Sequence, residues 1–419
     1  MKLTAGIHKP HYPLYMLILA DITAFLLLFF RKTPYDVNSL LMGGSLTAAI
    51  LTVYFLIRRL RLGDEYIFIV VAMLFSIGEM MLYRLDRELG VKQAIWLGIG
   101  FLIFFAAYFI FRRYRTWDRL IYFYIAGSIV LFAATMIFGS EIKGSKNWIV
   151  LPAFSIQTSE VTKLLFIFFL ASYYSRREEL FARCSKMWVQ AGFMLVTYLL
   201  MGLLVLQKEW GTPLLLFLIY FVIIYIFENN PRIFLVNGLA AAAAGVTGAL
   251  FVNHIRVRIA AWLNPWGDIA DKGYQIAQSL FAIGAGGFFG TGIGLGRPEL
   301  IPDVRTDFIF SAICEEMGIF GGVAVILLFL LLSYRGFKIA LGCGDVFNKT
   351  LALGITLMFA FQTFIIIGGV IKLLLLTGIT LPFISYGGSS LVTNFAALGI
   401  LQAISAGQPA DGSVDNENG

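Results

Sequence analysis

The chain alternates long apolar runs with short polar segments. A helix that crosses a membrane needs about 20 mostly apolar residues, and twelve runs are candidates by that criterion. They are centred near residues 14–30, 39–57, 65–83, 94–111, 120–139, 159–175, 188–206, 211–227, 233–252, 310–333, 350–371 and 389–406. The pattern predicts an all-α, polytopic membrane protein with about twelve transmembrane helices. We expect the first run to be a retained anchor, because no small-residue cleavage site of a signal peptide follows it.

Composition supports this fold class. Hydrophobic residues make up 59% and charged residues 14% of the 419 residues, whereas soluble domains are about half apolar and about a quarter charged. An ordinary soluble enzyme, a disordered chain and a small disulfide scaffold are therefore excluded. The three cysteines have no CxxC spacing and the three histidines form no HExxH motif. Neither a zinc site nor histidine-based metal catalysis is indicated.

Lys and Arg cluster on alternate connections. The richer connections carry Arg58, Arg59 and Arg61; Arg112, Arg113, Arg115 and Arg119; Arg176, Arg177, Arg183 and Lys186; and Arg335, Lys338 and Lys349. Cytoplasmic loops hold the excess of Lys and Arg, so we expect both termini in the cytoplasm. The formal net charge of +7 is then a topology signal and not an affinity for nucleic acid.

This orientation places four connections outside: 140–158, 207–211, 253–309 and 372–388. The third is the longest and is rich in aromatic residues, which favours segments that lie in the membrane interface; a plain amphipathic connector is the alternative. Within it, Gly284–Gly296 reads GAGGFFGTGIGLG. No strand precedes this run and it lacks nucleotide-binding spacing, so we expect close backbone packing at a membrane re-entry.

Ionisable groups in or beside spans indicate function by default. Glu160 and Lys163 share a helix face, Lys208 and Glu209 occupy a short outside connection, and Asp307 precedes an apolar run. We expect all of these residues in the outer half of the membrane. Glu315 and Glu316, which lie within the next apolar run, are the exceptions and are not expected in that half. A structural ion pair, a helix cap, inter-helix hydrogen bonds and lysines that reach the head groups are the alternative interpretations.

An outside site has no cytosolic ATP, so a bond-forming reaction there needs an activated substrate such as a lipid-linked diphosphate sugar. The reaction needs a base for the acceptor hydroxyl and cations for the leaving diphosphate. Asp307 is the candidate base. The candidate cations are Lys143, Lys146, Lys163, Arg256 and Arg258. A transporter with buried carboxylates has the same pattern, so the residues leave both classes open.

Five segments resemble signature motifs of the SEDS family (shape, elongation, division and sporulation) in family order. They are QTSEVTK from Gln157, QKEWGT from Gln207, GYQIAQSLFAIGAGG from Gly273, IPDVRTDFIFSAICEEMG from Ile301 and TGITLPFISYGGSS from Thr377. The resemblance covers roughly residues 65–406. It implies a ten-span core at 65–407 and an added transmembrane hairpin at 1–64. The short, polar stretch at 408–419 predicts a disordered cytoplasmic tail.

The resemblance also implies an activity. SEDS proteins are peptidoglycan glycosyltransferases that polymerise lipid II, an undecaprenyl-diphosphate disaccharide-peptide, at the outer face of the bacterial cytoplasmic membrane. They serve cell shape, division or sporulation and work with a class B penicillin-binding protein. A lipid II flippase and an inactive scaffold for the transpeptidase are the alternatives. Glycan synthesis in detergent, where no leaflets exist, separates the enzyme from the flippase.

The resemblance assigns roles to particular residues. Asp307 matches the family's essential Asp, and Lys163 matches a Lys that faces the family's central cavity. The predicted substrate-binding residues are Lys163, Glu160, Lys143, Lys146, Arg256, Arg258, Arg305, Gln278, Ser385 and Tyr386. A divalent cation (Mg or Mn) on the diphosphate is compatible with the reaction, although no cluster of protein ligands predicts it.

The chain departs from the family pattern at several of these motifs. Arg305 replaces a usual His, Thr158 a Pro and Glu209 an Asp. Asn147 stands where a loop Arg is common, and Lys146 beside it is a candidate substitute. These departures concern how the donor diphosphate is held, whereas the candidate base is retained.

Overall fold

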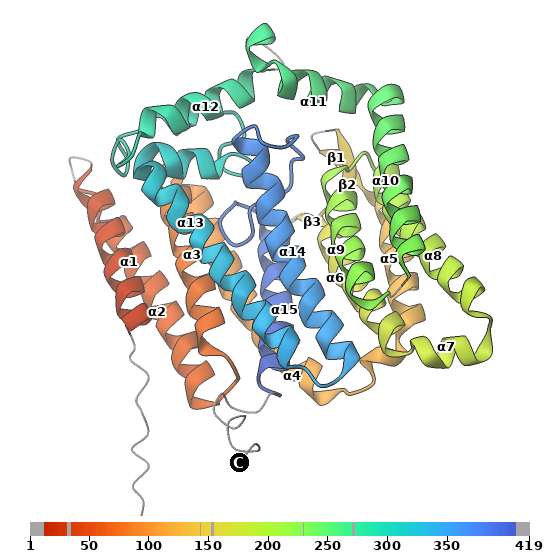
Figure 1. Ribbon diagram of the computed structural model, residues 1–419. Coiled ribbons are helices and arrows are strands. Elements are labelled where there is room, and N and C mark those ends of the chain that lie inside the picture. Colours follow the sequence, from red (N-terminus) through yellow and green to blue (C-terminus); the bar gives the residue numbers. More distant parts are fainter. Residues whose placement is uncertain are drawn as a thin grey trace, which may run out of the picture.

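The protein is a bundle of long helices with a small sheet at one end (Figure 1). The computed structural model describes residues 12–31, 35–142, 144–151, 155–228, 230–269 and 273–407. Its helices are α1 (Tyr12–Phe30), α2 (Val37–Arg59), α3 (Glu65–Leu85), α4 (Arg87–Arg113), α5 (Ile121–Phe138), α6 (Thr158–Ser175), α7 (Arg177–Arg183), α8 (Lys186–Leu206), α9 (Gly211–Phe227), α10 (Pro231–Phe251), α11 (Asn253–Leu263), α12 (Tyr274–Gly286), α13 (Ile309–Gly342), α14 (Val346–Val370) and α15 (Gly388–Ser405). Short 3-10 turns are η1 (Trp117–Arg119), η2 (Pro265–Asp268) and η3 (Pro298–Leu300), and the antiparallel sheet has the order β1 (Ser140–Ile142), β2 (Ser145–Val150) and β3 (Ser155–Gln157).

Each of the twelve predicted runs coincides with a helix. Among the residues that the structure describes, ten helices are long and apolar enough to cross a membrane. The other two runs form α9, which has 17 residues, and α6, which has 18 residues and begins with the polar sequence TSEVTK. The predicted all-α, polytopic membrane architecture is confirmed.

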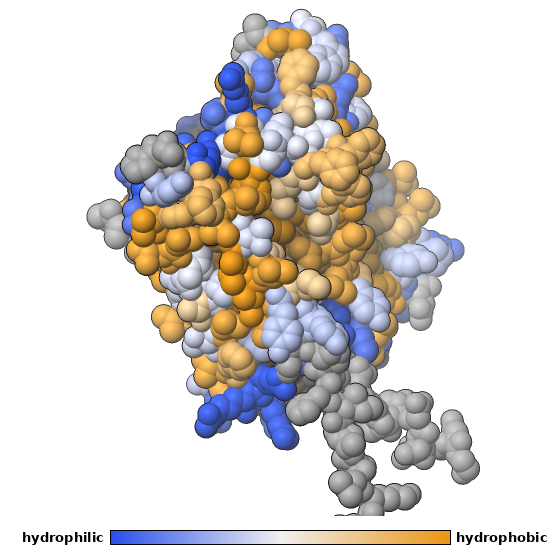
Figure 2. Space-filling view, turned by 90° about the vertical axis from the view of Figure 1, so that its left-hand side faces the viewer, coloured by the Kyte–Doolittle hydropathy of each residue, from blue (hydrophilic) through white to orange (hydrophobic). Residues whose placement is uncertain are grey.

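The two ends of the bundle differ. The sheet, α11 and α12 lie at the upper end in Figure 1, whereas α7 and the C-terminal end of α15 lie at the lower end. The arginine-rich connections, between α2 and α3, α4 and α5, α6 and α8, and α13 and α14, are also at the lower end. Figure 2 shows hydrophobic side chains over the middle of the face near α1 and hydrophilic ones toward both its upper and its lower end. The cytoplasmic position of the lower end stays a prediction.

The centre of the bundle is formed by α3, α14 and α15, the most buried of the long apolar helices described. Helix α14 packs against α13, α6, α9 and α15, while α15 packs most extensively on α4. Close approach of these two requires a small residue, because an added Cβ at Gly399 would lie 2.3 Å from the carbonyl oxygen of Phe104. Helix α3 begins at the N-cap Asp64, whose side chain accepts from the amide of Tyr66.

Helix α13 is broken at Gly318, where φ is 71° and ψ is −173°. The predicted span at 310–333 is therefore a helix in two parts: residues 309–317 form a separate first part, and the longer second part crosses the bundle (Figure 1). Glu316 lies at the same end of the bundle as the connection between α3 and α4, whereas the sequence led us to expect it in the other half from Asp307. Its Oε1 is 2.6 Å from Nε of Arg84, at the upper end of α3. Hydropathy alone could not reveal the break, since both parts are apolar.

The glycine-rich run packs against this break. The amides of Thr291 and Gly292 donate to the carbonyl oxygens of Glu315 and Glu316, which the break leaves without partners in the helix. A Cβ added at Gly290 would lie 2.2 Å from the carbonyl oxygen of Glu316. The predicted close backbone packing of the run is confirmed.

The first two helices pack on each other and on α3. Gly43 of α2 lies under the ring of Phe25, and the hydroxyl of Thr47 donates to Oδ2 of the buried Asp21 at 3.3 Å. At the upper end, Asp36 forms an ion pair with Arg87 at 3.1 Å. The hairpin is thus a packed part of the bundle, while its boundary at residue 64 and its role stay predictions. The predicted tail at 408–419 lies outside the described residues.

Candidate functional site

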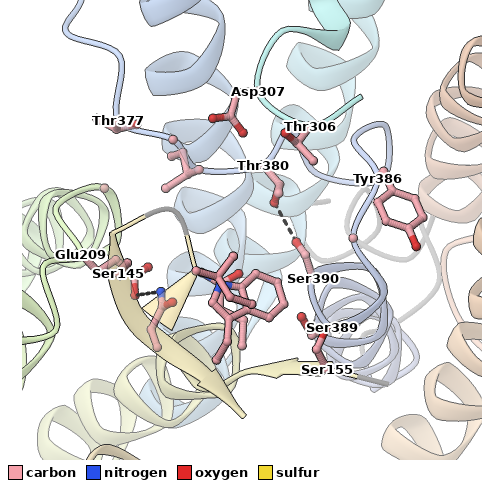
Figure 3. A pocket seen from close by; sticks show the side chains of 18 of the residues that line it. Ser145, Ser155, Glu209, Thr306, Asp307, Thr377, Thr380, Tyr386, Ser389 and Ser390 are labelled. Atoms are coloured by element: carbon pink, nitrogen blue, oxygen red, sulfur yellow. Dashed lines mark hydrogen bonds between the residues drawn. The ribbon is translucent and has the colours of Figure 1, made fainter. Parts of the chain in front are cut away.

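A cavity of about 1230 Å³ opens among segments at the upper end of the bundle. Its lining comes from the start of α4, the sheet, the α8–α9 connection, the start of α11, the loop before α13 and the segment 377–390. In Figure 3, Asp307 and Thr306 lie on one side of the cavity, and Glu209 and Ser145 on another. Charged and aromatic lining residues include Lys92, Trp96, Glu141, Trp148, Lys208, Glu209, Arg258, Asp307 and Tyr386.

Asp307 is presented to the cavity by a tight turn. The carbonyl oxygen of Asp303, which has a φ of 54°, accepts hydrogen bonds from the amides of Thr306, Asp307 and Phe308. Helix α13 starts immediately afterwards, at Ile309. Asp307 is half-buried, so its carboxylate is accessible from the cavity while its backbone is fixed.

A cation accompanies Asp307. A Cβ added at Gly378 would lie 3.6 Å from Oδ2 of Asp307 and 3.9 Å from Nη2 of Arg258, so both charged groups flank the same glycine. Nη1 of Arg258 donates to the carbonyl oxygen of Leu376 at 2.7 Å. Burial lowers the pKa of Arg258, and the Asp307 carboxylate acts in the opposite direction. A guanidinium stays charged in proteins, so the cavity holds a carboxylate and a cation side by side.

The segment 377–390 connects to the turn of Asp307. The amide of Tyr386 donates to the carbonyl oxygen of Arg305 at 2.9 Å, and the hydroxyl of Ser385 donates to the carbonyl oxygen of Thr306 at 2.5 Å. Ser385 also accepts from the amide of Leu381 at 2.9 Å. Ser385 therefore joins two loops and is not among the residues that line the cavity, whereas Tyr386 lines it.

Glu160 and Lys163 form a buried ion pair in the first two turns of α6. Nζ of Lys163 is 2.8 Å from Oε2 of Glu160, and it donates to Oε1 of Gln362 at 3.1 Å. Neither Glu160 nor Lys163 is among the cavity-lining residues. Their predicted contact with substrate stays a prediction.

The departure at residue 147 changes the surroundings of Glu209. Nδ2 of Asn147 donates to Oε2 of Glu209 at 2.7 Å, and Thr212 donates to Oε1. Burial raises the pKa of Glu209, and the hydrogen bonds from Thr212, Asn147 and Ser159 oppose this rise. Nζ of Lys146 instead donates to the carbonyl oxygen of Met136 at 2.7 Å, and Lys146 does not line the cavity.

Several other predicted residues lie away from the cavity lining. Arg256 donates to the carbonyl oxygen of Leu250 at 2.5 Å, Arg305 forms an ion pair with Asp86 at 3.2 Å, and Gln278 lies on α12. Lys143 lies outside the described residues. The substrate-binding roles of these four residues stay predictions.

Two lysines of the cavity were not among the predicted substrate-binding residues. Lys208 belongs to the QKEWGT motif, but the sequence favoured contact with lipid head groups; it has a φ of 60° and lies 3.5 Å from Glu141. Lys92 has no motif that could have identified it. Among the described residues no three His, Cys, Asp or Glu side chains group as metal ligands. The described acidic, His and Cys side chains therefore form no cluster that would hold the divalent cation considered for the diphosphate.

Comparisons with known proteins agree with this architecture. Peptidoglycan glycosyltransferase RodA of Mycobacterium tuberculosis is 36% identical over 369 residues, which cover 82% of this chain and 78% of that protein. Stage V sporulation protein E of Bacillus subtilis is 35% identical over 82% of this chain and 96% of that protein. The crystal structure of Thermus thermophilus rod shape determining protein RodA matches with a TM-score of 0.62 and 29% identity, over 83% of this chain and 98% of that one.

A second solved structure extends the comparison. A chain from a study of how a peptidoglycan synthase complex coordinates polymerization and crosslinking matches with a TM-score of 0.69 and 29% identity, over 82% of this chain and 97% of that one. The family model for FtsW, RodA and SpoVE, described as cell cycle protein, matches residues 50–409. The match begins inside α2, before the predicted core boundary at residue 65. The chain therefore belongs to the FtsW/RodA/SpoVE family.

Proposed function

We propose that this chain is a peptidoglycan glycosyltransferase that polymerises lipid II in the cavity around Asp307. The observation that carries the proposal is the pairing of a half-buried, cavity-facing carboxylate with Arg258 at one glycine. Two of the curated relatives, named peptidoglycan glycosyltransferase RodA and probable peptidoglycan glycosyltransferase FtsW, support the reaction class. A general base and a cation are what glycosyl transfer from a diphosphate donor requires.

In the proposed step, Asp307 accepts the proton of the acceptor sugar's 4-hydroxyl. The hydroxyl oxygen attacks the anomeric carbon of the donor from the face opposite the diphosphate, so the new glycosidic bond forms as the bond to phosphate breaks. Undecaprenyl diphosphate leaves with the bonding electron pair, and configuration at the anomeric carbon inverts.

Cations of the cavity stabilise the leaving diphosphate. Arg258, Lys92 and Lys208 line the cavity, and groups aimed at the position where charge develops lower the barrier most effectively. The hydrogen bond from Arg258 to the carbonyl oxygen of Leu376 fixes the guanidinium beside Asp307. No step in this sequence passes through a metal ion.

The location and partner of the enzyme follow from the same proposal. The chain is a multi-pass membrane protein, and the arginine-rich lower end supports a cytoplasmic position for both termini. The cavity then faces outside, where lipid II is presented. A class B penicillin-binding protein is the proposed partner; the match to a chain from a peptidoglycan synthase complex supports such an assembly.

The test is synthesis of glycan from lipid II by purified protein in detergent. Asp307→Asn should lower the rate by about 100-fold or more, because a general base contributes about 10²–10⁴-fold. Asp303→Asn is the matched control, since Asp303 is exposed in the same turn and orders it through its backbone carbonyl. Wild-type rates from Asp307→Asn would remove Asp307 from the mechanism. A folded protein that makes no glycan in detergent would favour the flippase or scaffold.

A further inference from the structure

Lys163 is withdrawn from the cavity that it was expected to face. Its side chain is 2% exposed and contacts Glu160 at 2.8 Å and Gln362 at 3.1 Å. A buried ammonium is costly unless paired and hydrogen-bonded, and these two partners meet that need. Lys163 in this arrangement has no direct route to a diphosphate in the cavity.

Gln362 carries the contact onward. Because its Oε1 accepts from Lys163, its Nε2 is turned the other way and donates to the carbonyl oxygen of Thr380 at 2.8 Å. The opposite amide orientation would place two donors, Nε2 and the ammonium, against each other. Lys163 thus selects the orientation in which Gln362, itself 0% exposed, binds the segment 377–390.

Thr380 belongs to the cavity wall. Its hydroxyl is 2.9 Å from that of Ser390, and both residues line the cavity (Figure 3). A chain of polar contacts therefore runs from α6 through α14 to the segment 377–390 and the start of α15. It joins elements that are far apart in the sequence at one wall of the cavity.

The segment 377–390 also forms hydrogen bonds with the turn that carries Asp307. Ser385 donates to the carbonyl oxygen of Thr306, the amide of Tyr386 donates to that of Arg305, and Gly378 lies beside Asp307. A displacement of the segment 377–390 would therefore move the wall of the cavity and the turn of the proposed base together.

We propose that Gln362 is a positioning residue through which Lys163 fixes the segment 377–390, so that Lys163 and Gln362 act on turnover as one unit without touching the substrate. This inference rests on the proposed glycosyltransferase function. It assigns Gln362 a role in catalysis and replaces direct diphosphate binding by Lys163 with control of geometry. A misplacement of about 1 Å can cost about 10²-fold in rate, so such a role is large enough to measure.

A double-mutant cycle tests the proposal. Lys163→Met, Gln362→Met and the double variant are assayed for glycan synthesis from lipid II in detergent, with kcat and KM determined separately. Each single variant should lower kcat by about 10- to 100-fold and leave KM within about twofold. The double variant should be no slower than the slower single variant, because residues that act as one unit are strongly non-additive.

Further variants separate the contacts. Gln362→Glu keeps an acceptor for Lys163 but cannot donate to Thr380, so it should lose kcat as Gln362→Met does. Thr356→Val is the control for a buried polar residue of α14, since the Thr356 hydroxyl donates only to the carbonyl oxygen of Ala352 in its own helix. It should keep wild-type kinetics. If Lys163→Met does not fold, the cycle is repeated with Glu160→Gln in every variant, which removes the carboxylate that would be left unpaired.

The results discriminate clearly. Multiplicative losses in the double variant, a raised KM for Lys163→Met with Gln362→Met unaffected, or wild-type kinetics in both single variants would each overturn the inference. The first two outcomes would return Lys163 to substrate binding. An unsubstituted protein that makes no glycan at all would instead refute the proposed function, which is a separate result from additivity in an active enzyme.

Discussion

Arg84 should stabilise the part of the protein that immediately follows Asp307. Its Nε is 2.6 Å from Oε1 of Glu316, and its side chain is 4% exposed while that of Glu316 is 0% exposed. Nη2 of Arg84 donates to the carbonyl oxygen of Gly296 at 2.7 Å, and Nη1 lies 3.1 Å from Glu299. One guanidinium thus holds the first part of α13 and the glycine-rich run together at the break in the helix.

The magnitude follows from this burial. Removal of one partner of a buried ion pair costs about 3–5 kcal/mol, because the other charge is left uncompensated. Arg84→Met should therefore lower the free energy of unfolding by about that amount. Joint replacement by Arg84→Met and Glu316→Leu should cost less than the sum of the two single changes, since apolar residues can replace both charges.

The assay is unfolding in mixed micelles by titration with a denaturing detergent, together with hydrogen exchange. The amides of Gly294 and Arg297, which donate to Glu316 and Glu315 at 2.7 Å each, should exchange faster in Arg84→Met. Glycan synthesis should fall as the segment after Asp307 loosens.

Arg87→Met is the matched control. Arg87 is the first residue of α4, three positions after Arg84, and its pair with Asp36 at 3.1 Å has side chains that are 49% and 19% exposed. Such a pair contributes about 0–1 kcal/mol. Equal losses for Arg84→Met and Arg87→Met, or unchanged exchange at Gly294, would refute the reasoning that burial makes the Arg84 contact decisive.

Three further predictions address other parts of the molecule. Burial raises the pKa of Glu209 above its ordinary 4.5, so the ionised carboxylate destabilises the folded state, and this penalty is complete once the pH exceeds the folded-state pKa. Glu209→Gln should therefore raise the unfolding temperature at pH 8, and the gain should vanish as the pH falls toward 4.5. Each unit by which the pKa is raised corresponds to about 1.4 kcal/mol of unfolding free energy. Gly43→Ala should destabilise the hairpin by about 1–3 kcal/mol because its Cβ would lie 2.6 Å from the Phe25 ring, whereas Gly44→Ala, with open space, should be neutral or stabilising in the same unfolding titration. In sealed right-side-out vesicles an impermeant maleimide should label the exposed Cys184 only after permeabilisation; labelling of intact vesicles would reverse the assigned orientation.

The sequence by itself determined the membrane class, the positions of the twelve long apolar helices and the family. Hydropathy is a local property that lipid solvent imposes on each span, so all twelve predicted runs correspond to helices. Motif spacing likewise identified Asp307 as the candidate base and placed it directly before a helix. These features depend on neighbours in the chain, which are visible without the fold.

The tertiary structure alone decided which predicted residues meet. Gly318 breaks α13, and this break places Glu316 beside Arg84 at the upper end, which an apolar run could not disclose. The sequence motif favoured Lys163 over Arg258 as the cation that faces the cavity. The fold buries Lys163 against Gln362, 199 positions away, and brings Arg258 to the glycine beside Asp307. Pairings of this kind follow from helix packing over long sequence separations, and no local pattern of polar and apolar residues encodes them.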